Sequence, residues 1–486
     1  MSTPDSRTDE SDLCFLSAGE LTAGYRDGSL SPVDVTRATL ARITALNPVL
    51  NAYCLVDADG ALAAAAESER RWRAGTPFSA IDGVPTSIKD LILTRGWPTL
   101  RGSRTIDPGQ AWRDDAPATA RLREAGAVLL GKTTTPEFGW RASTVSPLTG
   151  VTRNPWDASR TPGGSSGGAA ASVAAGMGVL AVGTDGGGSV RIPAAFTGTV
   201  GIKPQFGRVP AWPASPMGTV AHLGPHARRV ADAAALLTVL SRPDPRDGWS
   251  LPAPDHDYAD DAARRDLEGV RIAYSPTLGH VRYLDPEIAQ ALDEAARVFA
   301  GLGAIVERID PGFPDCHHAF MVHWMASARD LVMQLSPAQR ELIDPGLAEA
   351  VEYADRFTLA DFLKAQRDRL EIAMRMRQLA RTHPLLLTPA TAVLPFDAER
   401  ISPPTPPGAG RFEPFDWTWW TPYSTPFNLS QQPALVVPCG SSLTGLPIAL
   451  QLVAPHHQEA ACIAAAAAYE AATPWHRARP RGKVPG

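Results

Sequence analysis

Residues 162–204 read PGGSSGGAAASVAAGMGVLAVGTDGGGSVRIPAAFTGTVGIKP. Two clusters of glycine and serine, at 162–168 and 183–189, flank a helix of small residues that continues into an apolar strand over 169–182. The ends of such a helix and strand can bring the two clusters together. The glycines at 186–188 stand beside a serine, and without side chains they let a tetrahedral intermediate approach backbone N–H groups closely. The stretch therefore indicates a helix and strand pair that carries an oxyanion hole.

Alternating helices and strands continue on both sides of this stretch. A serine and a proline, which favour a helix start, open the amphipathic helix expected over 31–46. Further helices are expected at 58–74, at 116–125 and from 286, and strands at 83–93, 127–131, 304–309, 385–389 and 445–455. Proline-containing stretches rich in other turn formers are expected to be loops, at 141–168, 240–262 and 396–415. The alternation predicts the α/β class.

The composition excludes several classes of protein. Of the 486 residues, 44% are hydrophobic and 20% are charged, which is typical of a globular chain and excludes a disordered scaffold. The net charge of −5 offers no basic surface for nucleic acid or an anionic membrane, so we expect neither as a partner. Residues 169–182, the most apolar long stretch, are too short to span a bilayer. With no secretory signal visible, we expect a cytoplasmic enzyme.

Two patterns have the spacing of nucleotide-binding loops. Residues 126–133, GAVLLGKT, match the Walker A spacing, but Ala, Val and Leu between the glycines favour a core strand over a phosphate loop. Residues 176–181 match a degenerate dinucleotide fingerprint, yet they follow a helix and precede a strand, the reverse of the required order. We expect no nucleotide cofactor.

Other patterns concern hydrolase and metal chemistry. Residues 163–167 fit G-x-S-x-G, the nucleophile elbow of α/β hydrolases, with His456 or His457 as a downstream base, but a turn-rich loop replaces the strand that an elbow requires. His222 and His226 cannot form a helical ligand pair because Gly224 and Pro225 lie between them. The histidines therefore support no metal site.

Lysine is rare in this chain. Only five of the 46 Lys and Arg residues are lysine. A coding bias towards arginine explains most of this shortage. Under such a bias, a lysine that persists favours a position where a permanently charged guanidinium would fail. Lys89, Lys132 and Lys203 lie in and around the glycine-rich stretch. We interpret Lys89 as the functional one, and expect Lys132 and Lys203 to be ordinary surface or capping lysines.

The chain resembles the amidase signature family of serine hydrolases. The resemblance rests on GVPTSIKD (83–90) and on the two glycine-serine clusters, and it extends to 21–48, 427–440 and 445–455. It implies an α/β amidase-signature fold, in which a large mixed β-sheet is covered by helices on both faces. It also implies a single domain over 1–486, made of an N-terminal helical region (1–80), a signature core (81–240) and a C-terminal part (241–486) that completes the sheet and the substrate pocket.

The resemblance also implies the site residues. The family uses a Ser-cisSer-Lys triad, and the motif positions place the lysine at Lys89, the bridging serine at Ser165 and the acylated nucleophile at Ser189. The implied oxyanion hole is the backbone of Gly186, Gly187 and Gly188 up to Ser189. The remaining polar residues of these loops are expected to hold the backbone in place: Ser166, Thr184, Asp185 and Arg191. The family usually carries a bulkier residue at the position of Gly186, so this loop is expected to be looser here.

The chemistry requires a neutral lysine. A serine hydroxyl needs a base, and a lysine serves as one only if burial lowers its pKa towards about 7 or 8. Arginine could not be neutralised in this way. We therefore expect an amide-bond hydrolase that works through an acyl-enzyme on Ser189, without metal or cofactor, and releases a carboxylate and ammonia or an amine.

The substrate is expected to be a small hydrophobic or aryl amide, with carbamates and 6-aminohexanoate-type oligomers also open. A tryptophan-rich segment is a candidate lining of the pocket, through Trp417, Trp419 and Trp420. Two alternatives stay open: the amidase component of a tRNA-dependent amidotransferase, which is a glutaminase, and an inert binding protein on the same fold. A homodimer is also left open.

Overall fold

The computed structural model describes residues 13–406 and 419–480. Eleven strands form one mixed sheet in the order β1-β3-β2-β6-β8-β7-β12-β13-β11-β9-β10. They are β1 (Tyr53–Val56), β2 (Pro85–Lys89), β3 (Val128–Thr133), β6 (Leu180–Asp185), β7 (Val200–Lys203), β8 (His222–Ala227), β9 (Arg271–Tyr274), β10 (Ile305–Arg308), β11 (Leu385–Pro389), β12 (Ala434–Ser441) and β13 (Pro447–Val453). Two short strands pair separately, β4 (Val145–Ser146) and β5 (Gly150–Val151).

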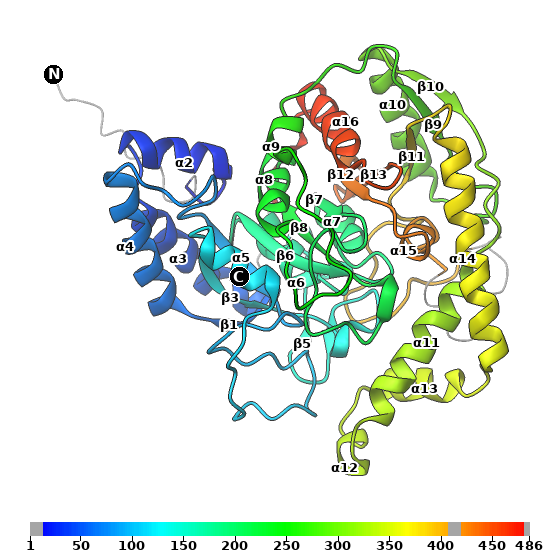
Figure 1. Cartoon of the computed structure of the whole chain (residues 1–486), viewed down its shortest axis with the longest axis horizontal. Helices are drawn as coiled ribbons and strands as arrows, with labels where there is room; N and C mark the ends of the chain where they lie inside the picture. The colour runs from blue at the N-terminus through cyan, green and yellow to red at the C-terminus, as the bar shows by residue number, and fades with distance from the viewer. Residues whose placement is uncertain (1–12, 407–418, 481–486) are drawn as a thin grey trace.

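Helices pack along this sheet (Figure 1). They are α2 (Ala18–Asp27), α3 (Pro32–Leu50), α4 (Ala58–Arg73), α5 (Pro117–Glu124), α6 (Gly167–Ala174), α7 (Arg191–Thr197), α8 (Val230–Leu240), α9 (Tyr258–Asp261), α10 (Pro286–Gly301), α11 (His317–Met333), α12 (Pro337–Arg340), α13 (Pro345–Ala354), α14 (Leu359–Leu379), α15 (Thr425–Leu429) and α16 (Glu459–Ala472). Short 3₁₀ turns lie at η1 (Glu137–Gly139), η2 (Gly218–Val220) and η3 (Trp475–Arg477).

Alternate residues of the central strands enter two different hydrophobic cores. On β11, Leu385 and Leu387 pack in one core, which also contains residues of α8, α10 and α16. Leu386, which points to the other face, packs in a second core with residues of α7, α11 and α14. The sheet is therefore covered by helices on both faces, and the predicted fold class is confirmed.

The sequence pattern located several elements well. Ser31 accepts hydrogen bonds from the N–H groups of Val33 and Asp34, with Pro32 at the first position, so α3 starts where expected. The region 1–80, expected to be helical, also contributes strand β1 at the sheet edge. Its residues Tyr, Cys, Leu and Val favour a strand.

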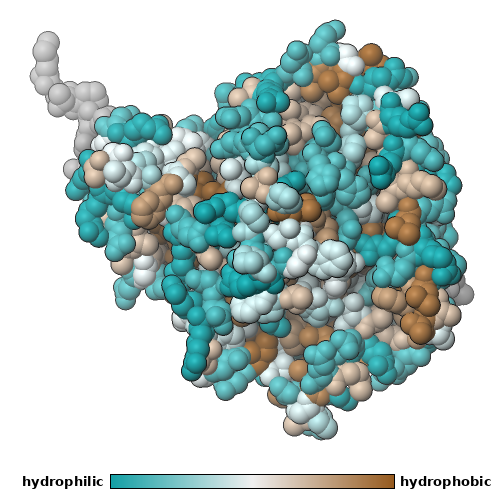
Figure 2. All heavy atoms as spheres, in the orientation of Figure 1, coloured by the Kyte–Doolittle hydropathy of each residue, from teal (hydrophilic) through white to brown (hydrophobic). Residues whose placement is uncertain are grey.

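The surface in Figure 2 is mostly hydrophilic, but brown atoms gather over α14. Four apolar side chains of this helix are exposed: Leu359, Leu363, Leu370 and Met374. Within residues 13–406 and 419–480, no helix combines the length and the hydropathy that crossing a bilayer requires.

Two parallel strands bring the two glycine-serine clusters to the same end of the sheet, where the carboxyl ends of these strands lie. β2 pairs with β6 in parallel, with Ile88 opposite Val182, so both strands end on the same side of the sheet. Lys89 is the last residue of β2, and Asp185 is the last residue of β6. The glycine-serine loop at 162–166 leads into α6, which packs on β6. In α/β sheets, ligands bind at the carboxyl ends of the parallel strands, so a site is expected at the carboxyl ends of β2 and β6.

Candidate active site

Lys89 lies at the centre of a cluster of hydroxyl groups. Its Nζ is 2.6 Å from Ser165 Oγ, 2.8 Å from Thr184 Oγ1 and 3.0 Å from Ser166 Oγ. The lysine side chain is fully buried. Three hydroxyls thus surround an amine that water does not reach, and both glycine-serine clusters supply them.

This burial controls the charge of the amine. Desolvation lowers the pKa of Lys89 well below the ordinary 10.5, and the negative charge of Asp185 opposes this effect without cancelling it. A lowered pKa favours the neutral amine at physiological pH, which is the form that can accept a proton. The geometry therefore gives Lys89 the environment that a lysine base needs.

Hydrogen bonds join the two glycine-serine clusters. The Ser166 N–H donates to Ser189 O at 3.2 Å. The Ser166 hydroxyl donates to Thr184 O at 3.0 Å and accepts from the Thr184 N–H at 3.1 Å. The peptide bond between Gly164 and Ser165 is cis. Ser165 and Ser189 are thereby placed on the wall of one cavity.

A buried ion pair holds the loop that carries Ser189. Arg191 donates to both carboxylate oxygens of Asp185, from Nη2 at 2.9 Å and from Nε at 3.0 Å. Arg191 Nη2 also donates to Asn428 Oδ1, and the Asn428 amide donates back to Asp185. Burial alone would raise the pKa of Asp185, but the charge and hydrogen bonds of Arg191 hold that pKa far below its usual range. The carboxylate stays charged and fully paired.

The carboxylate also fixes the backbone of the glycine run. Asp185 Oδ1 accepts the Gly188 N–H at 2.8 Å, so this N–H is already used inside the protein. Gly188 has φ +114°, and a Cβ there would lie 2.5 Å from Ser424 Oγ, so only glycine fits. The N–H groups of Gly186, Gly187 and Ser189 remain as the candidate donors of an oxyanion hole.

The serines open onto a cavity of about 120 Å³. Its wall combines polar atoms of the two loops with apolar side chains from distant parts of the chain, Leu91, Phe138, Trp212, Met217 and Trp324. No sequence motif predicts these apolar residues, because they are separated along the chain. Such a cavity, apolar with a few convergent polar groups, is typical of small-molecule sites.

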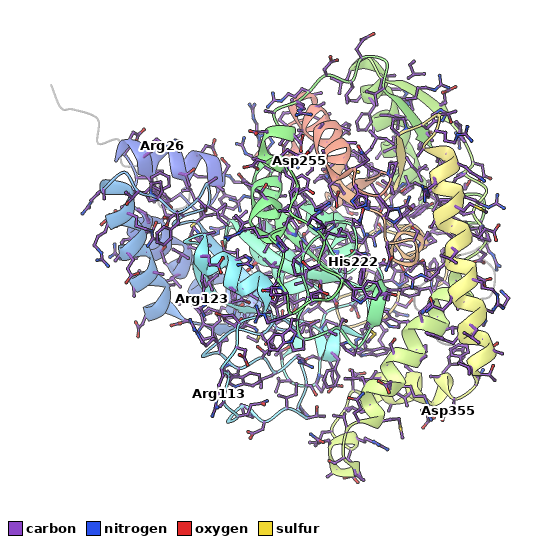
Figure 3. The ribbon with its side chains drawn as sticks, viewed as in Figure 1. Arg26, Arg113, Arg123, His222, Asp255 and Asp355 are labelled. Atoms are coloured by element: carbon purple, nitrogen blue, oxygen red, sulfur yellow. The ribbon has the colours of Figure 1, made fainter. Side chains whose placement is uncertain are left out.

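His222 lies on the same cavity wall, and Figure 3 shows it near the centre of the molecule. Its Nδ1 is 2.9 Å from Val220 O and 3.2 Å from Asp185 O, so these carbonyls fix a proton on Nδ1. Burial, reinforced by the charge of Lys203, lowers the pKa of His222 well below 6.5. The imidazole is therefore neutral.

The other candidate histidines lie elsewhere. His456, considered as a base for the G-x-S-x-G pattern, contacts Ser430 O at 2.9 Å through Nε2. The backbone N–H of His457 donates to the Gln205 side chain. Among the described residues, no group of three or more His, Cys, Asp or Glu side chains could hold a metal ion.

Lys132 and Lys203 are not surface or capping lysines, and that expectation was wrong. Both side chains are fully buried, since they lie on the interior strands β3 and β7. Lys132 Nζ contacts Ile92 O at 2.6 Å and Thr99 Oγ1 at 2.8 Å, and burial lowers its pKa to about 8. Lys203 Nζ donates to the backbone carbonyls of Pro204 and Gln432. Burial also lowers the pKa of Lys203 well below 10.5, and these contacts give both amino groups partners inside the sheet.

Part of the tryptophan-rich segment, including Trp417, lies outside the described residues. Trp420 is fully buried, and its ring stacks on Phe196 at 5.7 Å between centroids. Trp419 is half-buried and packs edge-on against Tyr283. Neither Trp419 nor Trp420 is among the residues that line the cavity beside Ser189. Their contacts place both rings in the second core.

Comparison with known proteins agrees with this geometry. The Amidase family matches residues 34–463. The chain belongs to the amidase signature family. It is 35% identical to an acylamidase from Rhodococcus erythropolis, over 97% of this chain and 98% of that protein. It is 36% identical to a glutamyl-tRNA(Gln) amidotransferase component from Myxococcus xanthus (strain DK1622), over 94% of this chain and 97% of that protein.

Solved structures of the family superpose closely on this amidase. A bacterial aryl acylamidase gives a TM-score of 0.88 at 31% identity and covers 96% of this chain and 98% of its own. The 6-aminohexanoate cyclic dimer hydrolase complexed with substrate gives 0.85 at 29% identity, over 96% of this chain and 99% of its own. The chain is therefore an amide hydrolase.

Proposed function

We propose that this amidase cleaves hydrophobic or aryl amides through an acyl-enzyme on Ser189, with Lys89 as the base and Ser165 as the bridge between them. The observation that carries the proposal is the buried Lys89 amine, 2.6 Å from Ser165 Oγ. A buried amine with a lowered pKa beside a hydroxyl is the arrangement that general-base activation of serine requires.

The reaction proceeds by proton transfers along a row of three residues, Ser189, Ser165 and Lys89. Lys89 Nζ accepts the Ser165 proton while Ser165 Oγ accepts the Ser189 proton, and Ser189 Oγ forms a bond to the carbonyl carbon. The carbonyl oxygen becomes an oxyanion, which the backbone N–H groups of Gly186, Gly187 and Ser189 stabilise. The C–N bond then breaks, and the relay runs backwards to protonate the leaving amine. Water, activated by the same relay, hydrolyses the ester on Ser189 and releases the carboxylate.

The supporting residues keep this row in place. Ser166 and Thr184 share hydrogen bonds with each other and with Lys89 Nζ, so they fix the amine. Asp185 and Arg191 hold the loop at 186–190 through the buried ion pair. All four act through other groups, the first two on the Lys89 amine and the last two on the loop, so they are positioning residues; Thr184 also lines the cavity.

The substrate class rests on the cavity wall. Phe138, Trp212, Met217 and Trp324 present aromatic and apolar surface beside Ser189, which favours a hydrophobic or aryl group. Two similar proteins are named acylamidase and aryl acylamidase, which supports the same class. The similarity to amidotransferase components makes glutamine the competing substrate.

A hydrolysis screen tests the proposal. Purified protein is assayed on anilides of short acids, aliphatic amides, aryl carbamates, 6-aminohexanoate cyclic dimer and glutamine, with Ser189→Ala as the control. We expect the anilides to be turned over by the isolated chain and Ser189→Ala to be inactive. Ammonia release from glutamine alone would contradict the substrate class, and full turnover by Ser189→Ala would contradict the nucleophile. Absence of all turnover, with no labelling of Ser189 by a fluorophosphonate, would favour an inert binding protein.

A further inference from the structure

Two aromatic side chains of α11 occupy the space beside two glycines of the Ser189 loop. A Cβ at Gly186 would lie 2.7 Å from Cζ3 of Trp324, and a Cβ at Gly187 would lie 2.6 Å from Cζ of Phe320. Phe320 and Trp324 are four residues apart, so they lie on one face of the helix. Their rings stack with centroids 5.5 Å apart and planes 21° apart. The two aromatic rings therefore fill the space that side chains at the two glycine positions would need.

The indole of Trp324 cannot easily move away. Its Nε1 donates to Trp140 O at 2.8 Å, the Phe320 ring covers one face, and the side chain is 4% exposed. Trp324 lines the cavity together with Gly186 and Ser189. A side chain at position 186 and the indole of Trp324 would need the same space, and here the indole has it.

We propose that Trp324 is a specificity-determining residue of this amidase, which limits the size of the substrate group that lies against Gly186. The proposal rests on the proposed function, because it assumes that the scissile carbonyl binds at the 186–189 backbone. A small residue at Gly186 predicts a looser loop than the family usually has. The space beside this glycine is filled by the Trp324 ring, which a distant helix supplies.

The pairing predicts how each partner responds to mutation. Trp324→Ala removes the indole and leaves open volume beside Gly186, so larger substrate groups gain access. Gly186→Ala creates a contact of 2.7 Å, well below the ordinary range of 3.4 to 4 Å, so either the ring or the catalytic loop must shift. Displacement of catalytic groups by about 1 Å costs on the order of 100-fold in rate. Gly186→Ala/Trp324→Phe removes the atoms that clash and should recover most of that loss.

The test compares kcat and KM in two substrate series. One series varies the acyl chain of a nitroanilide from acetyl to octanoyl, and the other varies the amine of an acetamide from methyl to naphthyl. The variants are Gly186→Ala, Trp324→Phe, Trp324→Ala and the double variant. Trp72→Phe is the matched control, because Trp72 is also a buried helical tryptophan, its Nε1 donates to the backbone oxygen of Asp82 at 3.1 Å, and it does not line the cavity.

We expect Trp324→Ala to shift the preference towards larger groups by about tenfold or more in one of the two series, mainly through KM. Gly186→Ala should lose about 10-fold to 100-fold in kcat/KM on small substrates, mainly through kcat, and the double variant should regain most of it. The preference of Trp72→Phe should match that of the wild type.

Three results would overturn the proposal. The first is an unchanged size preference in both series for Trp324→Ala and Trp324→Phe. The second is a loss in the double variant equal to the sum of the single losses, and the third is a shift of equal size in Trp72→Phe. Thermal melting checks that each variant is folded, and Trp324→Phe keeps the test available if Trp324→Ala unfolds. If Ser189→Ala stays active, the proposed function fails; if Ser189→Ala is inactive and the size preference is unchanged, only this inference fails.

Discussion

Replacing Lys89 with methionine should abolish hydrolysis while the fold survives. Methionine matches the length and burial of the lysine side chain but has no proton acceptor for Ser165. Loss of a general base typically costs 10²-fold to 10⁴-fold, and here the whole relay ends at Nζ, so we expect a fall in kcat/KM of about 1,000-fold or more, equivalent to about 4 kcal/mol.

The effect on stability should be smaller. Nζ contacts three hydroxyls, at 2.6, 2.8 and 3.0 Å, and net hydrogen bonds of this kind contribute about 1 kcal/mol each, so about 3 kcal/mol would be lost. Burial lowers the pKa of Lys89, which means that the folded state also bears a desolvation cost, and methionine removes it. The two changes oppose each other, so the net change in the free energy of unfolding should be below about 3 kcal/mol.

The assay pairs anilide hydrolysis with urea denaturation at the same pH. Lys364→Met is the matched control, because Lys364 is exposed on α14 and pairs with Asp368, so activity and stability should stay close to the wild type. Lys89→Arg should be as inactive as Lys89→Met, because the guanidinium stays charged. Retention of more than a tenth of kcat/KM in folded Lys89→Met would refute the role of the amine as base.

Three further predictions concern charge. Because only neutral Lys89 accepts a proton, and burial lowers its pKa, kcat/KM should rise with pH to a plateau whose inflection lies well below 10.5; an inflection at 10.5 or above would contradict this. Asp185→Asn leaves Arg191 buried without its charge partner and should cost about 3 to 5 kcal/mol in urea denaturation, whereas a change below about 1 kcal/mol would show that the pair does not hold the loop. The pKa of Lys132 is about 8 in the folded state, against 10.5 for an exposed lysine, so the unfolded chain binds more protons at this residue between these values, and Lys132 alone should add up to about 3 kcal/mol to the stability as pH rises from 8 to 10.5. Lys132→Met should lack this gain, and an identical slope in both proteins would disprove the assignment.

Local signals made part of the fold predictable. The cap and proline at 31–32 marked the start of α3, and the β-branched run before Lys89 marked β2. Strands β7 and β8 carried no such pattern, because glycine and proline interrupt them and their neighbours in the sheet determine their conformation. The helices between 317 and 379 were also missed, since their buried faces are defined by a core assembled from distant segments.

The site, like the fold, was predictable only where a local motif marked it. Family motifs and the scarcity of lysine singled out Lys89, whereas Lys132 and Lys203 were expected at the surface and are buried. Whether a lysine is buried depends on the strand order of the sheet, which no local motif predicts. The cavity wall is an extreme case, because Trp324 meets Gly186 only after α11 packs on the loop. Side chains that act across the fold leave no spacing signal in the chain.

In the proposed reaction Ser189 forms a covalent intermediate and Lys89 activates it. The most direct test is to incubate the protein with an aryl fluorophosphonate and to locate the adduct by intact mass and peptide mapping. We expect one adduct per chain, on Ser189, that is absent from Ser189→Ala and forms at least about 100-fold more slowly in folded Lys89→Met. An adduct on another residue, or an equal labelling rate in Lys89→Met, would contradict the proposed reaction.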